Sequence, residues 1–151
     1  MLRGGKGGIM SANDQVVGNL KQALEARGYE VTINDGTTRV KGEILAYRND
    51  VDLALTVVNV VDYEAQNNYR IQWETAMFNE VPWYVYEVPT VFISLNYKTH
   101  LHDATMVKTA INAYHHNTNT IAALLDCLEG KAAFKGQPNE LVWANKWQAK
   151  L

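Results

Sequence analysis

The sequence predicts a three-layer α/β/α fold, in which helices cover both faces of a mainly parallel β-sheet. Residues 53–61 and 90–95 are nearly unbroken apolar and β-branched runs, as expected of parallel strands that are buried on both faces. Helical patterns alternate with these runs, which implies right-handed crossovers and helices on both sides of the sheet. At 151 residues with 47% hydrophobic side chains, the chain can bury a core of this kind.

The predicted domain spans residues 11–151, and residues 1–10 are expected to form a flexible leader because four of them are glycine. A helix is expected to follow the leader, since Ser11 and Asp14 have the spacing of a capping box. Gly28 suits the left-handed residue beyond the last turn of this helix. The apolar side chains that recur at helical spacing are Val16, Val17, Leu20, Ala23 and Leu24.

The next predicted elements are a short strand and a second helix. Residues 29–33 alternate enough to be a strand, and residues 34–36, which read Asn-Asp-Gly, are expected to turn the chain after it. Val40, Ile44 and Tyr47 indicate a shorter helix ahead of the first apolar run.

The last predicted elements are a third strand and a closing helix. Residues 107–114 form the strand, and Asn117 or Thr118 caps the helix, which Gly130 ends. One apolar face of this helix is formed by Ile121, Leu124, Leu125 and Leu128. Residues 62–87 are a long polar and aromatic segment, and connections of that length usually carry function or further structure.

Composition excludes several classes of protein. The net charge of −2 offers no basic stripe for nucleic acid or an anionic membrane. One cysteine, Cys127, cannot form an internal disulfide, so the fold does not depend on an oxidising compartment. No stretch approaches the roughly 20 apolar residues that cross a bilayer. Residues 1–10 have no apolar run of the kind found in a signal peptide.

No catalytic residue, metal site or cofactor site is expected from local motifs. Residues 4–8 (GGKGG) lack the preceding strand and the hydroxyl residue of a phosphate loop. His100 and His102 could share one face of an extended segment, but no third ligand accompanies them. The carboxylates in loop-like regions carry no pattern that marks an acid or a nucleophile: Asp62, Glu64, Glu74, Glu80, Glu87 and Asp103.

An aromatic-rich stretch is the strongest candidate for a binding surface. It contains Trp73, Trp83, Tyr84 and Tyr86. Aromatic rings stack on sugars, they anchor protein interfaces, and they also fill ordinary cores. The residues alone leave these three alternatives open.

Several segments resemble one known family, in order along the chain. Residues 88–103 read VPTVFISLNYKTHLHD and residues 106–114 read MVKTAINAY. The shorter segments are YRIQW at residues 69–73, EVPWYVYEVP at residues 80–89 and FKG at residues 134–136. Together they resemble the C-terminal domain of glycoside hydrolase family three β-N-acetylhexosaminidases, also called N-acetylglucosaminidases.

The resemblance implies a flavodoxin-like domain that supports a catalytic (β/α) barrel without taking part in catalysis. In the family the barrel supplies an Asp nucleophile and a loop His–Asp acid/base pair, so the chain alone is expected to be inactive. The parent enzyme would hydrolyse terminal β-linked N-acetylglucosamine by double displacement. Expected partners are this barrel and a second copy of the chain, with neither nucleic acid nor membrane.

The resemblance also assigns roles to single residues. His100 and Asp103 would lie in a structural turn, and Asn68 and Arg70 would join the aromatic residues as interdomain contacts. His102 stands where the family has Leu. The family domain opens with an apolar strand, whereas this chain offers only residues 7–10, GGIM.

Two other functions remain open at this stage. One is a stand-alone module that binds carbohydrate or protein through its aromatic residues. The other is a small enzyme with its site at the carboxyl ends of the strands, where open α/β sheets bind ligands.

Overall fold

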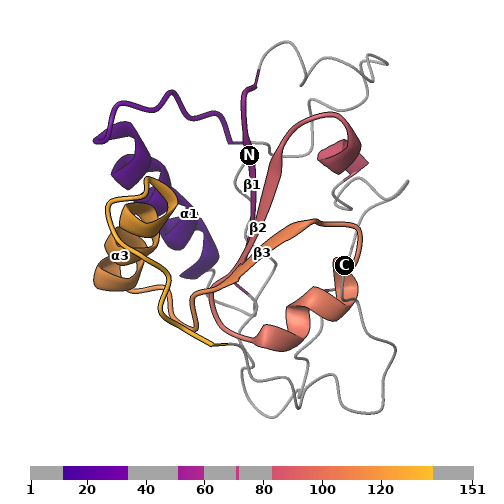
Figure 1. The fold of residues 1–151 in the computed structure, drawn as a ribbon. Coiled ribbons are helices and arrows are strands. Elements are labelled where there is room, and N and C mark those ends of the chain that lie inside the picture. The colour runs from indigo at the N-terminus through magenta and orange to yellow at the C-terminus, as the bar shows by residue number, and fades with distance from the viewer. Residues whose placement is uncertain (1–11, 34–50, 60–70, 72–82, 138–151) are drawn as a thin grey trace.

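The computed structural model describes residues 12–33, 51–59, 71 and 83–137, which are drawn in colour in Figure 1. The helices and strands, in chain order, are α1 (Ala12–Glu25), β1 (Ala54–Val58), the 3₁₀ helix η3 (Trp83–Tyr86), β2 (Thr90–Ser94), the 3₁₀ helix η4 (Lys98–Asp103), β3 (Thr109–Asn112) and α3 (Thr118–Leu128). The leader, the turn at 34–36 and the helix predicted from Val40, Ile44 and Tyr47 lie outside the described residues.

The sheet has three parallel strands in the order β1-β2-β3. Phe92 in β2 lies opposite Thr56 in β1 and Ala110 in β3, so β2 is hydrogen-bonded along both of its edges. All five residues of β1 are buried, as its apolar run predicts for a strand covered on both faces. The predicted α/β class, the parallel sheet and the strands predicted within residues 53–61, 90–95 and 107–114 are therefore confirmed, with β2 in the centre of the described sheet.

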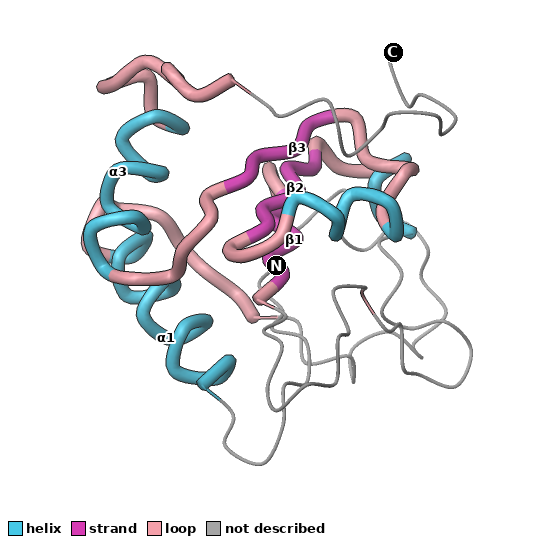
Figure 2. Tube along the Cα trace, turned by 90° about the horizontal axis from the view of Figure 1, so that it is seen from below, coloured by secondary structure: helices cyan, strands magenta, loops and turns pink. Residues whose placement is uncertain are grey.

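One face of the sheet is covered by α1 and α3, which lie together on the same side in Figures 1 and 2. Leu20 of α1 is fully buried, and Ile121 and Leu125 of α3 are each 2% exposed. They pack against the inward-facing residues of β1 and β2. Period-2 alternation along the strands and period-3.6 spacing along the helices bring these side chains together.

The opposite face is covered, among the described residues, by η3, η4 and the turn after η4 (Figure 2). Phe92, which is 1% exposed, packs there with Val58, Ala104 and Val107. A smaller cluster at the start of β1 and β2 contains Ala54, Tyr84 and Val88. The sheet thus lies between two apolar layers, as its two-sided strand sequences require.

The ends of the two long helices follow the predicted signals. Asn117, one of the two predicted caps, accepts a hydrogen bond from the Thr120 N–H at 2.8 Å and so satisfies a free amide in the first turn of α3. Gly28 and Gly130 both have positive φ, +93° and +72°, in the left-handed region that glycine adopts without strain.

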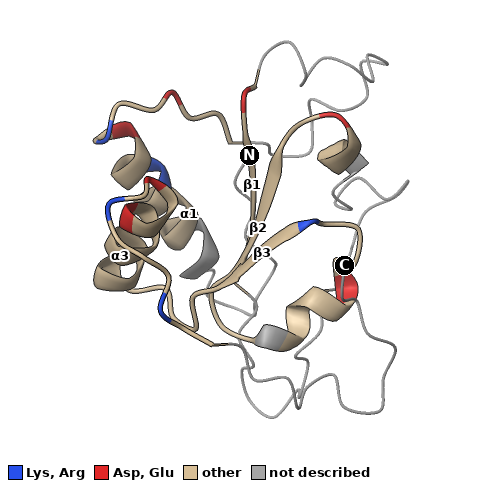
Figure 3. Cartoon of the chain, in the orientation of Figure 1, with Lys and Arg blue, Asp and Glu red and all other residues tan. Residues whose placement is uncertain are grey.

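Charged residues of both signs mix where the ends of α1 and α3 meet (Figure 3). The Arg27 guanidinium lies 2.8 Å from Asp126 and 2.5 Å from Glu129, and it also donates to the Ala122 carbonyl at 3.2 Å. Lys131 is 2.7 Å from the same Glu129 oxygen. Hydrogen bonds from Lys131 and then from Arg27 hold the pKa of Glu129 below its ordinary value. These contacts join the two helices on their solvent side.

The predicted strand over residues 29–33 is wrong. Tyr29 is 49% and Ile33 is 38% exposed, and of the five residues only Val31 packs against the core. Alternation can place one side chain inward, but a strand also needs a neighbour for its backbone hydrogen bonds. In the described sheet β1 pairs with β2, and residues 29–33 pair with neither.

No helix among the described residues is long and apolar enough to cross a bilayer.

We predict that Phe92→Asp will lower the free energy of unfolding by more than about 3 kcal/mol, because it places an unpaired charge in a packed core. Chemical denaturation measures this loss. Ala110→Asp is the matched control, since Ala110 lies opposite Phe92 in the next strand but is exposed. It should cost no more than about 1 kcal/mol. Equal losses in the two variants would mean that Phe92 is not in a core.

Candidate functional site

Tyr84 in η3 is a core residue rather than an exposed anchor. It is 2% exposed, and its hydroxyl lies 2.6 Å from the Thr56 hydroxyl in β1. The amide groups of Glu87 and Val88 donate to the Tyr84 carbonyl at 2.9 and 3.0 Å. Of the three alternatives for the aromatic stretch, core packing therefore holds for Tyr84, and this residue fixes η3 against the sheet.

Tyr86, two residues later, is 85% exposed. Its backbone belongs to the same short helix, so its ring projects from a segment that Tyr84 holds in place. The chain after η3 is held as well: Ala54 N–H donates to the Pro89 carbonyl at 2.9 Å, and the Thr90 hydroxyl donates to the Val88 carbonyl at 2.8 Å. Because the backbone is held here, only the side-chain torsions of Tyr86 would lose freedom on contact with a partner.

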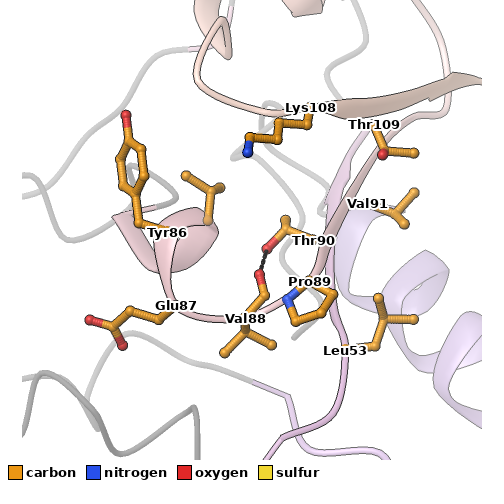
Figure 4. A pocket seen from close by; sticks show the side chains of 10 residues that line it. Leu53, Tyr86, Glu87, Val88, Pro89, Thr90, Val91, Lys108 and Thr109 are labelled. Carbon is orange, nitrogen blue, oxygen red and sulfur yellow. Dashed lines mark hydrogen bonds between the residues drawn. The ribbon is translucent and has the colours of Figure 1, made fainter.

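Tyr86 borders a hollow of about 350 Å³ at the amino ends of the three strands (Figure 4), called here the amino-edge hollow. Lys108 reaches from the start of β3 toward η3, whereas Glu87 points away from the hollow (Figure 4). The lining residues are Leu53, Val85, Tyr86, Glu87, Val88, Pro89, Thr90, Val91, Lys108 and Thr109. Five of these residues are aliphatic, and the charged ones are Glu87 and Lys108.

The other predicted contact residues are placed only in part. Trp83 is the first residue of η3. Asn68, Arg70 and Trp73 lie outside the described residues, but Ile71 between them is described. Its N–H donates to the Asp103 carboxylate at 2.9 Å, so η4 holds the backbone of this segment.

His100 lies in η4 and is fully buried. Its Nδ1 is 2.7 Å from the Ser94 hydroxyl at the end of β2, and its ring meets the Tyr97 ring edge-on with 5.7 Å between centroids. Burial lowers the pKa of His100 to about 4, although the Asp103 charge acts in the opposite direction. His100 and Asp103 thus lie in the same 3₁₀ helix, and each connects that helix to another segment.

The described residues offer little for metal or acid–base chemistry. No group of three His, Cys, Asp or Glu side chains among them could hold a metal ion. His115 Nδ1 accepts the backbone N–H groups of His116 and Asn117 at 2.9 and 3.1 Å, so that lone pair is already occupied. Cys127 is half-buried in α3.

The carboxylates considered from the sequence are mostly outside the described residues. These are Asp62, Glu64, Glu74 and Glu80. Of the remaining two, Glu87 turns away from the amino-edge hollow and Asp103 is bonded to the Ile71 backbone. Among the described residues, Glu87 is the one carboxylate that lines the amino-edge hollow, so this lining lacks the pair that a retaining glycosidase uses.

An asparagine pair at the carboxyl edge of the sheet was missed by sequence reasoning. The Asn96 amide donates to the Asn59 side-chain oxygen, which joins the residues that follow β1 and β2. The available signal was that Asn96 comes directly after the apolar run at residues 90–95 and that Asn59 is the one amide side chain within the run at residues 53–61. In open α/β sheets this edge is the usual ligand site, but here the two amides bond to each other.

Comparisons with known proteins show that the chain is similar to parts of longer proteins. No family model matches it. A β-N-acetylglucosaminidase/β-glucosidase of Cellulomonas fimi is 34% identical over 151 residues, covering 97% of this chain and 26% of that protein. The solved structure of β-glucoside phosphorylase BglX superposes with a TM-score of 0.74 at 29% identity, over 99% of this chain and 26% of that one.

A second solved structure, β-glucoside phosphorylase BglX bound to 2FGlc, has a TM-score of 0.70 at 30% identity, over 90% of this chain and 24% of that one. The chain therefore spans about a quarter of the length of the proteins it matches. At least 90% of the chain has a counterpart in each of them, and most of each of them has no counterpart here.

We predict that Tyr84→Phe will lower the free energy of unfolding by about 1–2 kcal/mol, because it leaves the buried Thr56 hydroxyl without the Tyr84 oxygen. The double variant Thr56→Val/Tyr84→Phe should recover part of this loss, because both hydroxyls are removed and no buried hydroxyl is left unpaired. Thermal or chemical unfolding of the unaltered chain, Thr56→Val, Tyr84→Phe and the double variant measures the coupling. Strictly additive losses would show that the two hydroxyls do not interact.

Proposed function

We propose that this chain is a C-terminal α/β domain of a glycoside hydrolase family three enzyme and that it packs against the catalytic barrel of that enzyme. The best support is the difference between two lengths: the match includes 97% of this chain but only 26% of the Cellulomonas fimi relative. A segment that is a quarter of a glycosidase and has no carboxylate pair at a described site is best suited to a supporting role.

The parent enzyme, in this proposal, acts on β-linked N-acetylglucosamine. The resemblance of the strand and turn at residues 88–103 to the hexosaminidase branch supports this sugar. The Cellulomonas fimi relative is named for both N-acetylglucosamine and glucose, so β-glucosides are the next substrate to test. In a retaining enzyme of this kind two barrel residues would act as nucleophile and acid/base, and this domain would keep the barrel loops in place.

The docking face that we favour is centred on Tyr86 and the amino-edge hollow. Interdomain faces within a chain typically bury about 600–1,500 Å² and use aromatic anchors. Tyr86 is the most exposed of the large hydrophobic side chains described, and the hollow beside it could receive an apolar side chain from the barrel. Lys108 at the rim favours an acidic residue opposite it.

Trp83, the first residue of η3, and the predicted contacts Asn68, Arg70 and Trp73 would extend this face. In the absence of the barrel, an exposed aromatic face of this kind invites association with a second copy of the chain.

A stand-alone carbohydrate-binding module is the second candidate, because the exposed Tyr86 ring is the kind of platform on which a sugar stacks. Binding of N-acetylglucosamine by the isolated chain, lost in Tyr86→Ser, would favour this module over the docking face.

We predict that the isolated chain has no glycosidase activity, because the nucleophile and acid/base are assigned to the barrel. It should be incubated with chromogenic β-N-acetylglucosaminide and β-glucoside from about pH 5 to about pH 8, with and without inorganic phosphate. Turnover that persists through purification and disappears when one of the chain's own carboxylates is replaced would contradict the proposal.

We also predict that the isolated chain self-associates through the Tyr86 face. Light scattering at increasing protein concentration should show a rising mean mass, and Tyr86→Ser should reduce it because it removes the exposed ring. Tyr114→Ser is the control, since Tyr114 is 56% exposed beyond the carboxyl end of β3. A chain that stays monomeric, or equal effects of the two substitutions, would remove Tyr86 as the anchor.

A further inference from the structure

The junction between β2 and η4 is closed by three groups: the Ser94 hydroxyl, the Tyr97 carbonyl and the His100 imidazole. The Ser94 hydroxyl donates to the Tyr97 carbonyl at 2.7 Å, and the same oxygen lies 2.7 Å from His100 Nδ1. The oxygen of Ser94 and the ring of His100 are buried, so these contacts are made away from solvent. They attach η4 to the carboxyl end of the central strand.

The two contacts of Ser94 determine the tautomer of His100. A serine hydroxyl carries a single hydrogen, and here that hydrogen is directed to the Tyr97 carbonyl. The Ser94 oxygen must therefore accept from His100, which places the hydrogen of the neutral imidazole on Nδ1. His100 Nε2 then carries the lone pair, and it is buried without a hydrogen-bond partner.

This arrangement stabilises the neutral imidazole of His100 relative to the protonated one. Protonation would add an N–H at Nε2, where the structure provides no acceptor, and a buried unpaired donor on a cation is costly. The charged group among the described residues that acts on the ring is Asp103, which favours protonation. One Asp103 oxygen already accepts the Ile71 N–H, and burial outweighs the attraction.

We propose that His100 is an acid-sensitive latch: the neutral ring holds η4 against the carboxyl end of β2, and protonation of the ring releases η4 from the sheet. Release would affect more than one turn. Ala104, directly after η4, packs with Phe92, and Asp103 holds the backbone at Ile71. Opening the latch therefore uncovers the part of this sheet face that η4 and the turn after it cover.

The direction of the pH dependence follows from the two states of the ring. In the folded chain the pKa of His100 is lowered from 6.5 to about 4, so between these values the unfolded chain binds the proton more readily. The stabilisation is complete above about pH 6.5 and is lost as the pH falls toward about 4. From about pH 7.5 to about pH 5, this group alone should reduce the folding equilibrium constant by up to about 30-fold.

The test combines a measurement on the unaltered chain with one matched pair of variants. Nitrogen-15 NMR of the imidazole rings should show His100 protonated at Nδ1 only, and still neutral at about pH 5. His100→Asn keeps an amide donor near the position of Nδ1 but cannot titrate. Between about pH 7.5 and about pH 5, the folding equilibrium constant of the unaltered chain should therefore decrease by a factor about 30 times larger than that of His100→Asn.

His115→Asn is the control, because His115 is exposed, and it should keep the full acid sensitivity. A His100 ring that takes up its second proton near pH 6.5, or one protonated at Nε2 in the neutral form, would overturn the proposal. So would an acid sensitivity of His100→Asn equal to that of the unaltered chain. If His100→Asn does not fold, the NMR titration of the unaltered chain decides the question by itself.

Discussion

The burial of β2 on both faces and both edges is the constraint on which the rest of the structure depends. Phe92 packs on one face of the strand, Ile93 and Leu95 pack on the other, and β1 and β3 take up the backbone hydrogen bonds on either side. A strand in this position has no polar surface, so each face must be covered. α1 and α3 cover one face, and η3, η4 and the turn that follows η4 cover the other.

Polar side chains lie where β2 begins and ends, because the chain must turn there without leaving buried polar groups unpaired. At the amino end, the hydroxyls of Tyr84 and Thr56 pair, and Thr90 satisfies the Val88 carbonyl. At the carboxyl end, Ser94 satisfies the Tyr97 carbonyl and accepts from His100. The buried position of Tyr84 also explains why Tyr86 is exposed. The two residues are two positions apart in one short helix, so when one side chain points into the fold the other points into solvent.

The comparisons are consistent with a scaffold that supports more than one chemistry. The matched proteins are named as a β-N-acetylglucosaminidase/β-glucosidase and as a β-glucoside phosphorylase, two different reaction types. The same α/β domain occurs in both with similar coverage, about a quarter of each protein. A fold shared by proteins with different named reactions does not by itself specify a reaction.

The sequence by itself determined the α/β class, the three parallel strands, the Asn117 cap and the glycines that end α1 and α3, because these depend on local periodicity and on backbone conformation. Residues 29–33 show the limit of such signals: their alternation is local, but a strand requires a partner that only the assembled sheet can provide. Tertiary structure also decided between Tyr84 and Tyr86, which are close in sequence and chemically alike. One is in contact with Thr56, 28 residues earlier in the chain, and the other meets no such neighbour and remains in solvent. The tautomer of His100 was decided in the same way, because it depends on where the Ser94 hydroxyl points once β2 and η4 have packed.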